Sequence, residues 1–163
     1  MKVHDVMAKN PVCCTPGDDI AAVAAVMIDY NTSVVPVTEQ HFHPSRLLGV
    51  ITERDLIGKV LAQGKDPYSI DAAECLSGDV LSCGPNDEVS DALALMRESG
   101  LLRLPVVTLK GELAGVISLS DIIRHQGADS QELFRVLSVI CMNDGPRRPV
   151  EPMPARPRPK AAA

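Results

Sequence analysis

The chain has 163 residues, of which 45% are apolar, enough to fill the core of one ordinary globular unit or of two small ones sharing a core. Residues 1–144 carry 11 Lys and Arg against 20 Asp and Glu, a net charge of −9, which argues against a nucleic-acid-binding surface. The longest apolar runs are far shorter than the roughly 20 residues of a membrane span, and no signal-peptide core follows Met1, so we expect a cytoplasmic protein.

The first predicted helix follows Pro16 and ends at the turn signal Asn31. Two short runs rich in β-branched residues, 33–38 and 47–51, then predict a hairpin around the polar loop "TEQHFHPSR". The helix between Pro16 and Asn31 is indicated by apolar residues at helical spacing, namely Ile20, Val23, Ala24, Met27 and Ile28.

The stretch "GVITERDL", residues 49–56, predicts the start of another helix. Thr52 and Asp55 match the S/T-x-x-D/E capping box, in which both side chains accept hydrogen bonds from backbone N–H groups at the helix start. Taken alone, this motif indicates only a capped helix.

A second copy of the same pattern follows. "TPGDDIAAVAAVM" from Thr15 aligns with "GPNDEVSDALALM" from Gly84 at an offset of 69, which also places "VVPV" over "RLPV". "GVITERDL" aligns with "GVISLSDI" at an offset of 66, so the first copy carries three extra residues in its polar loop, where insertions cost little.

The second copy predicts the same elements in the same order. Its helix carries Val89, Ala92, Leu93 and Met96 and ends at Gly100, and its strands are 102–108 and 113–117. We therefore expect five segments: repeat 1 over 1–63, a linker over 64–74, repeat 2 over 75–126, a C-terminal helix over 127–143 and a disordered tail over 144–163.

The segment after the second copy predicts one more helix. "DSQELFRVLSVICM" can be capped by Asp129 or Ser130 and places Leu133, Val136, Leu137 and Ile140 on one face. Docking on its own repeat is favoured over a dimer or partner contact.

The tail holds 6 of the 13 prolines and a net charge of +4 over residues 145–163, which is typical of a disordered solubilising segment. Contact with an acidic partner or a membrane surface is the alternative.

This β-α-β-β-α repeat resembles the cystathionine-β-synthase (CBS) domain. The resemblance rests on the hydrophobic-x-Pro-hydrophobic strand and the Gly-φ-φ-Thr/Ser-x-x-Asp ending, found twice within residues 1–126. It implies an α+β fold of two repeats about a pseudo-twofold axis, and a homodimer formed through helices. Residues 127–163 are too few to fold as an enzyme domain, so we expect a regulatory protein without catalysis.

The doubled motif suits a nucleoside phosphate. A carboxylate at the helix start can accept hydrogen bonds from two ribose hydroxyls, while the hydroxyl three residues before it can face a phosphate. Pro36 and Pro105 each remove a ladder donor, so their strands are expected at an edge or bulge, with backbone groups free to pair with a base. Neighbouring apolar side chains would sandwich that base: Val35, Val37, Leu104 and Val106.

The CBS resemblance implies an adenosine ligand (AMP, ADP, ATP or S-adenosylmethionine) bound in the clefts between the repeats, and no required cofactor. In repeat 1 the matching residues are Thr15, Val35, Pro36, Val37, Thr52, Arg54 and Asp55. In repeat 2 they are Arg103, Leu104, Pro105, Val106, Ser118 and Asp121. Arg103 favours the second copy because a guanidinium can bind phosphate through two hydrogen bonds, whereas Gly84 replaces Thr15 there.

Three functional hypotheses follow. The leading one is a stand-alone sensor that relays ligand binding to an unidentified client protein. The alternative is a ligand-free interaction module acting through its C-terminal helix and tail. The third is a metal or redox protein built on His41, His43 and the five cysteines; the absence of a C-x-x-C pair and of further ligands beside the histidines favours buried thiols and a solvated loop instead.

Overall fold

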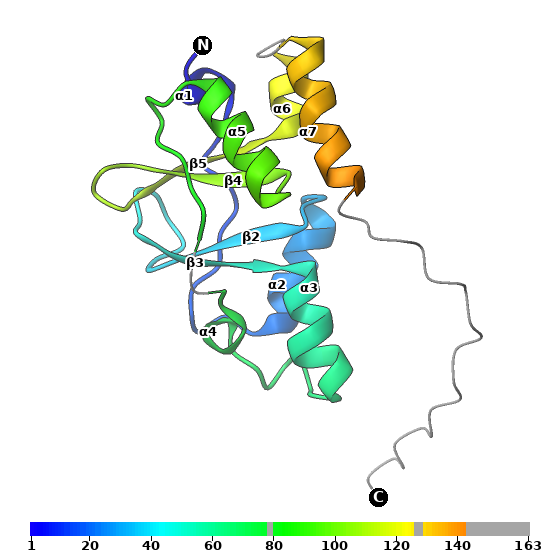
Figure 1. Ribbon diagram of the computed structural model, residues 1–163. Coiled ribbons are helices and arrows are strands. Elements are labelled where there is room, and N and C mark those ends of the chain that lie inside the picture. Colours follow the sequence, from blue (N-terminus) through cyan, green and yellow to red (C-terminus); the bar gives the residue numbers. More distant parts are fainter. Residues whose placement is uncertain (78–79, 126–128, 143–163) are drawn as a thin grey trace, which may run out of the picture.

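Two antiparallel hairpins form the centre of this computed structural model, which describes residues 1–77, 80–125 and 129–142 (Figure 1). Pro36 lies opposite Val50 in one hairpin and Pro105 opposite Val116 in the other, so the registers match between the repeats. The strands are β2 (Val34–Thr38) with β3 (Leu47–Thr52), and β4 (Arg103–Val107) with β5 (Leu113–Ser118). The predicted α+β repeat is thereby confirmed.

Each hairpin is flanked by two helical segments, as the periodicity predicts. The first helix of each repeat ends at a residue with positive φ, Asn31 at 48° and Gly100 at 71°. These helices are α2 (Ile20–Asp29) and α5 (Val89–Ser99). The second helical segments are α3 (Glu53–Asp55), which continues as the π-helix η1 (Leu56–Val60) and the 3₁₀-helix η2 (Leu61–Gln63), and α6 (Leu119–Arg124).

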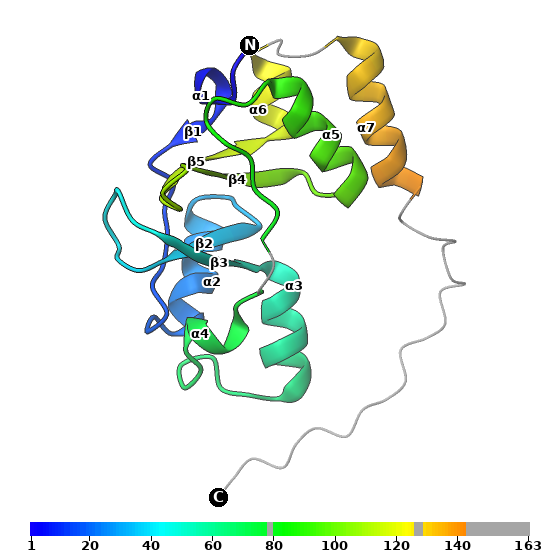
Figure 2. The ribbon, with the colours of Figure 1, turned by 60° about the vertical axis from the view of Figure 1, so that its left-hand side comes forward.

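The two repeats exchange short segments. Near the N-terminus, α1 (Val3–Val6) packs in the core of repeat 2, and β1 (Ala8–Lys9) pairs with β5 (Figure 2). In return, α4 (Ala72–Cys75), which begins inside the stretch expected as a linker, packs in the core of repeat 1. The core of repeat 2 is therefore completed by α1, which precedes the hairpin of repeat 1. The core of repeat 1 is completed by α4, which precedes the hairpin of repeat 2.

Three buried cysteines lie in these cores: Cys14 and Cys75 in repeat 1, and Cys83 in repeat 2. Cys14 and Cys83 each form a single parallel bridge, to Val37 and Val106, so the first strand of each repeat is reduced to one residue pair. They lie in different cores. Burial raises the pKa of Cys14 to about 12 and the pKa of Cys83 to about 11, which keeps both thiols neutral.

The C-terminal helix α7 (Ser130–Met142) docks on its own repeat, as expected. Asp129 Oδ1 accepts the Glu132 N–H at 2.8 Å, and Val136 is 1% exposed within the core of repeat 2. Phe134 is 71% exposed. Leu137, which was expected on the packed face, is 42% exposed and borders a pocket together with Arg103 and Leu119. The predicted inward position of Ile140 and the predicted tail lie outside what the structure describes.

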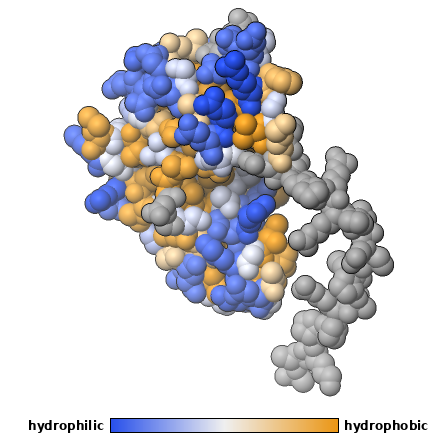
Figure 3. Space-filling model, in the orientation of Figure 1, coloured by the Kyte–Doolittle hydropathy of each residue, from blue (hydrophilic) through white to orange (hydrophobic). Residues whose placement is uncertain are grey.

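On the face that Figure 3 shows, hydrophobic and hydrophilic residues are interspersed, with hydrophobic surface toward the middle. Within the described residues, no helix has the length and apolar character needed to cross a membrane.

Candidate functional site

Both predicted capping boxes form. In repeat 1, the Thr52 hydroxyl donates to Asp55 Oδ2 at 2.6 Å and the Thr52 N–H donates to the same oxygen at 2.9 Å. In repeat 2, the Ser118 N–H donates to Asp121 Oδ2 at 3.1 Å, and the Asp121 N–H donates to Ser118 Oγ at 3.1 Å. The local prediction from S/T-x-x-D is confirmed in both copies.

A cleft of about 270 Å³ lies between the repeats, on the Asp121 side. Both repeats line it, together with the N-terminal segment whose strand β1 pairs with β5. Repeat 1 contributes Tyr30, Asn31, Thr32, Val34 and Pro36. Repeat 2 contributes Arg103, Val116, Ser118, Ser120, Asp121 and Arg124, and the N-terminal segment adds Ala8, Pro11 and Val12.

The polar groups of this cleft converge at the start of α6. Ser118 Oγ lies 2.7 Å from Ser120 Oγ, and Arg124 Nη1 donates to Asp121 Oδ1 at 3.2 Å. Arg103 reaches the same cleft from β4, where its Nη1 donates to Ser33 Oγ at 2.8 Å. Two guanidinium groups and one carboxylate line the cleft, so its charge favours an anionic group.

The predicted site residues account for four of the fourteen residues that line this cleft, and the sequence analysis missed the others, among them Tyr30 and Arg124. Tyr30 is the C-terminal neighbour of α2 and is 64% exposed, which leaves its ring available to a flat ligand. Arg124 stands one turn beyond Asp121 in α6. The i,i+3 spacing of Asp121 and Arg124 was a signal for this ion pair, whereas nothing local connects Tyr30 with repeat 2.

The expected sandwich of a base between four apolar side chains is corrected by the structure. All four side chains are 0% exposed and pack in the two cores, because side chains alternate between the two faces of a strand. The residues concerned are Val35, Val37, Leu104 and Val106. Their neighbours Val34 and Pro36 line the cleft instead.

The backbone of the proline strands is also less open than expected. The carbonyls of Pro36 and Pro105 accept hydrogen bonds from the N–H groups of Cys14 and Cys83, at 3.0 and 3.1 Å. The Thr38 N–H donates in turn to the Cys14 carbonyl at 2.9 Å. These backbone groups are therefore paired within each repeat rather than available for the ring nitrogens of a base.

The Asp55 side of the pair differs from the Asp121 side. Lys59 Nζ lies 2.9 Å from Asp55 Oδ1, and Ser77 Oγ donates to the same oxygen at 3.2 Å. Burial alone would raise the pKa of Asp55, but hydrogen bonds from Thr52 and Lys59, with the charge of Lys59, hold that pKa below its ordinary value. Arg54, the neighbouring candidate, is exposed on α3.

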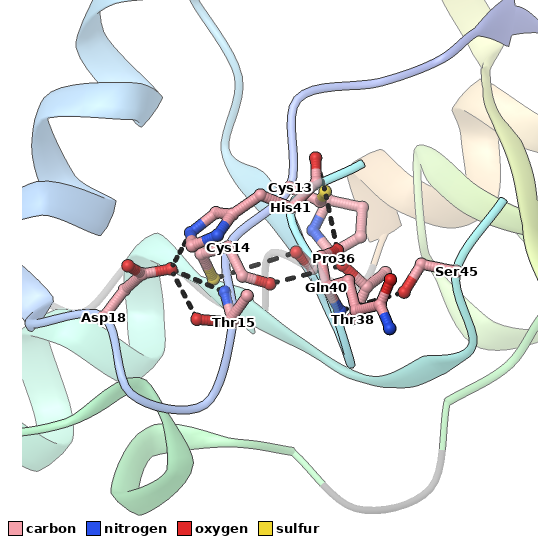
Figure 4. Close-up of polar contacts among 9 residues, drawn as sticks. All are labelled: Cys13, Cys14, Thr15, Asp18, Pro36, Thr38, Gln40, His41 and Ser45. Atoms are coloured by element: carbon pink, nitrogen blue, oxygen red, sulfur yellow. Dashed lines mark hydrogen bonds and ion pairs between the residues drawn. The ribbon is translucent and has the colours of Figure 1, made fainter. Parts of the chain in front are cut away.

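Thr15 belongs to a separate polar cluster beneath the inserted loop (Figure 4). Its N–H and hydroxyl donate to Asp18 Oδ2 at 2.6 and 3.1 Å, and His41 Nε2 lies 2.8 Å from that oxygen. Burial raises the pKa of Asp18, but these hydrogen bonds outweigh it and lower the pKa overall. His43 is directed elsewhere, with Nε2 3.0 Å from the Pro11 carbonyl, so the two histidines do not converge on one point.

Comparison with known proteins agrees with this architecture. A family model described as the CBS domain matches residues 3–62 and 72–128. An uncharacterised protein of Methanopyrus kandleri is 31% identical over 124 residues, which cover 76% of this chain. The match spans 62% of that relative, less than two thirds of its length.

Two solved structures share the fold at modest identity. Hypoxic Response Protein I of Mycobacterium tuberculosis, solved with two coordinated zinc ions, gives a TM-score of 0.67 at 27% identity, covering 77% of this chain and 98% of that one. The CBS domain pair of protein MJ0100, in complex with 5′-methylthioadenosine and S-adenosylmethionine, gives 0.64 at 25% identity, covering 77% and 99%.

Proposed function

Because the chain belongs to the CBS-domain family, we propose that it is a regulatory module that binds an adenosine derivative in the cleft on the Asp121 side, without catalysing a reaction. The observation that carries this proposal is the convergence of Asp121, Ser118 and Arg103 on one cleft between the repeats. The complex of the MJ0100 domain pair with two adenosine compounds supports the same ligand class.

Each part of such a ligand has a complementary group in the cleft. The Asp121 carboxylate accepts hydrogen bonds from ribose hydroxyls once Arg124 swings aside, since Arg124 is 71% exposed and free to change rotamer. Arg103 then binds a phosphate by charge-assisted hydrogen bonds. Val34, Pro36 and the ring of Tyr30 contact the faces of the base.

The same geometry provides a route to regulation. The ligand touches β2 of repeat 1 and the β5–α6 junction of repeat 2, so its affinity depends on how the two repeats are placed. A ligand with different affinities for two arrangements shifts their populations, and a client protein that binds one arrangement detects the shift. We expect the client protein to bind the repeat pair or α7.

A thermal-shift experiment tests this function with AMP, ATP, S-adenosylmethionine and NADH. A ligand at about 100 times its Kd adds about 2.7 kcal/mol of stability. We expect a stabilising ligand among these, and we expect Asp121→Asn to remove its effect while the matched variant Asp55→Asn retains it. If all four compounds leave the melting temperature unchanged, the ligand-free interaction module becomes the better description.

The proposal also includes a homodimer. Ile28, Ile57 and Leu61 are 80%, 58% and 74% exposed, and the last two border an apolar groove of about 170 Å³ between α2 and η1. Pairing this surface with its copy would bury side chains that otherwise face water. Sedimentation velocity should show a dimer that Leu61→Asp dissociates, while Leu109→Asp, at an exposed hairpin turn, leaves it intact. A monomeric wild type contradicts this part of the proposal.

The proposed location is the cytoplasm. Cys13, Cys14, Cys75 and Cys83 are free thiols, which is typical of a reducing compartment.

A further inference from the structure

The two aspartates of the capping boxes have matching positions in the repeats but different neighbours. The internal alignment pairs Asp55 with Asp121 and Lys59 with His125, both at an offset of 66. It also pairs Ser77 with Ala8 at an offset of 69, and the structure agrees, because Ser77 bridges to Val50 as Ala8 pairs with Val116. Lys59 and His125, and likewise Ser77 and Ala8, therefore occupy equivalent positions in the two repeats.

In repeat 1, both sides of the Asp55 carboxylate are occupied by the chain itself. Lys59 Nζ lies 2.9 Å from Oδ1, and Ser77 Oγ donates to Oδ1 and Oδ2 at 3.2 and 3.3 Å. Lys59 is anchored further, since Nζ donates to the carbonyls of Cys75 at 2.8 Å and Leu76 at 3.3 Å, at the end of α4. Only 12% of the Asp55 side chain is exposed.

The equivalent groups in repeat 2 do not bind the Asp121 carboxylate, although its side chain is only 19% exposed. Ala8 has no hydroxyl, and His125 Nδ1 lies 2.9 Å from the backbone carbonyl of Asp121 rather than from its carboxylate. Among the residues that the structure describes, the ion-pair partner of Asp121 is Arg124, whose side chain is 71% exposed. A guanidinium in water is displaced at much lower cost than an ammonium held by two carbonyls.

We propose that Lys59 and Ser77 act as a built-in occupant of the Asp55 position, so that each chain binds one adenosine ligand, at Asp121. This inference rests on the proposed function for the ligand class, but it adds which residues set the stoichiometry. A ribose entering at Asp55 must displace the Lys59 ammonium and the Ser77 hydroxyl together. The displaced ammonium would also lose its two carbonyl partners.

Isothermal titration calorimetry with AMP, and separately with S-adenosylmethionine, tests the proposal on the full chain. The wild type should bind one molecule per chain. Lys59→His/Ser77→Ala gives repeat 1 the residues that repeat 2 carries, and should raise the stoichiometry to two. The reverse exchange, Ala8→Ser/His125→Lys, should close the Asp121 position and remove binding. Circular dichroism checks that each variant is folded.

The outcomes separate this inference from the proposed function. Two molecules bound by the wild type, or one molecule still bound by folded Lys59→His/Ser77→Ala, overturns the built-in occupant and leaves the function standing. Binding by Lys59→His/Ser77→Ala but not by the wild type upholds the occupant and refutes binding at Asp121. If neither protein binds either compound, both proposals fail. Should Lys59→His/Ser77→Ala not fold, retention of binding by Ala8→Ser/His125→Lys refutes the occupant.

Discussion

Arg103 Nη1 donates a 2.8 Å hydrogen bond to Ser33 Oγ, which joins two residues 70 positions apart across the boundary between the repeats. Ser33 directly precedes β2, and Arg103 begins β4, so the bond connects the two proline strands at their start. It also fixes the guanidinium at the wall of the cleft. A charged group held by a neutral hydroxyl can exchange that partner for a phosphate with a net gain.

Replacing Arg103 should therefore affect phosphorylated ligands selectively. We expect Arg103→Gln to weaken the binding of AMP by roughly 10- to 100-fold, because hydrogen bonds to charged groups contribute about 1.5–3 kcal/mol. The affinity for adenosine should stay nearly constant. Calorimetric titration with both compounds measures the difference, and Arg54→Gln on α3 provides the matched control. An equal loss for AMP and adenosine means that Arg103 does not recognise the phosphate.

Asp55→Asn should destabilise the fold in a pH-dependent way. The pKa of Asp55 is lowered in the folded state, so its stabilisation is complete above the ordinary value of about 3.9 and is lost as the pH falls through the folded pKa. We expect a loss of about 1–3 kcal/mol at pH 7 that disappears in strong acid. Urea unfolding from pH 2.5 to 7 tests this, with exposed Asp29→Asn as control; a loss independent of pH contradicts the role of the charge.

Val3→Ala should destabilise repeat 2, although Val3 lies at the other end of the chain. Its side chain is 0% exposed in the core of that repeat, and full burial of a valine contributes about 1.5–3 kcal/mol. Hydrogen exchange should show faster opening of β4 and β5 than of β2 and β3. Met1→Ala, at a half-exposed side chain, should have little effect. Uniform opening of both hairpins contradicts this assignment.

The thiols of Cys14 and Cys83 should resist modification while the chain is folded. Burial raises their pKa to about 12 and about 11, which leaves very little thiolate at pH 8. Because the folded pKa is raised, the neutral form stabilises the fold fully below about pH 8.5, and this contribution declines as the pH rises toward the folded values. Titration with a chromogenic disulfide, before and after guanidinium, measures the protection. Fast reaction of both thiols in the native state refutes it.

Two substitutions on α7 distinguish its inner and outer surfaces. Val136→Ala should cost about 1.5–3 kcal/mol, because Val136 is 1% exposed in the core of repeat 2. Phe134→Ser should leave the free energy of unfolding almost unchanged, since Phe134 is 71% exposed. Chemical denaturation measures both. If Phe134→Ser destabilises as much as Val136→Ala, the helix docks in another orientation.

Local patterns in the sequence predicted the helices, hairpins and caps well, because each depends on residues close together in the chain. Spacing of three and four placed Val89, Leu93 and Met96 on one buried face, and S/T-x-x-D formed both boxes. The alternation of side chains along a strand, which the sequence analysis did not apply, sends Val35 and Val37 inward. Applying it to the ligand wall would have selected Val34 and Pro36.

Long-range relationships were beyond local patterns. The exchange of α1 and α4 between cores depends on how two finished repeats pack, and so does the meeting of Tyr30 with Asp121 in one cleft. The contact of Ser77 with Asp55 joins residues 22 positions apart and was also beyond local patterns, whereas the i,i+4 spacing of Asp55 and Lys59 was a local signal that the sequence analysis did not use.

The exchange of α1 and α4 also bears on how such a chain could be divided. A half that ends before α4 lacks Ala72 and Cys75, and the other half lacks Val3 and Val6, so each carries a gap shaped for a segment of its counterpart. Each half alone therefore has an incomplete core, and the residues that complete it belong to the other half. The two repeats are therefore complementary parts of one fold rather than two independent domains joined by a linker.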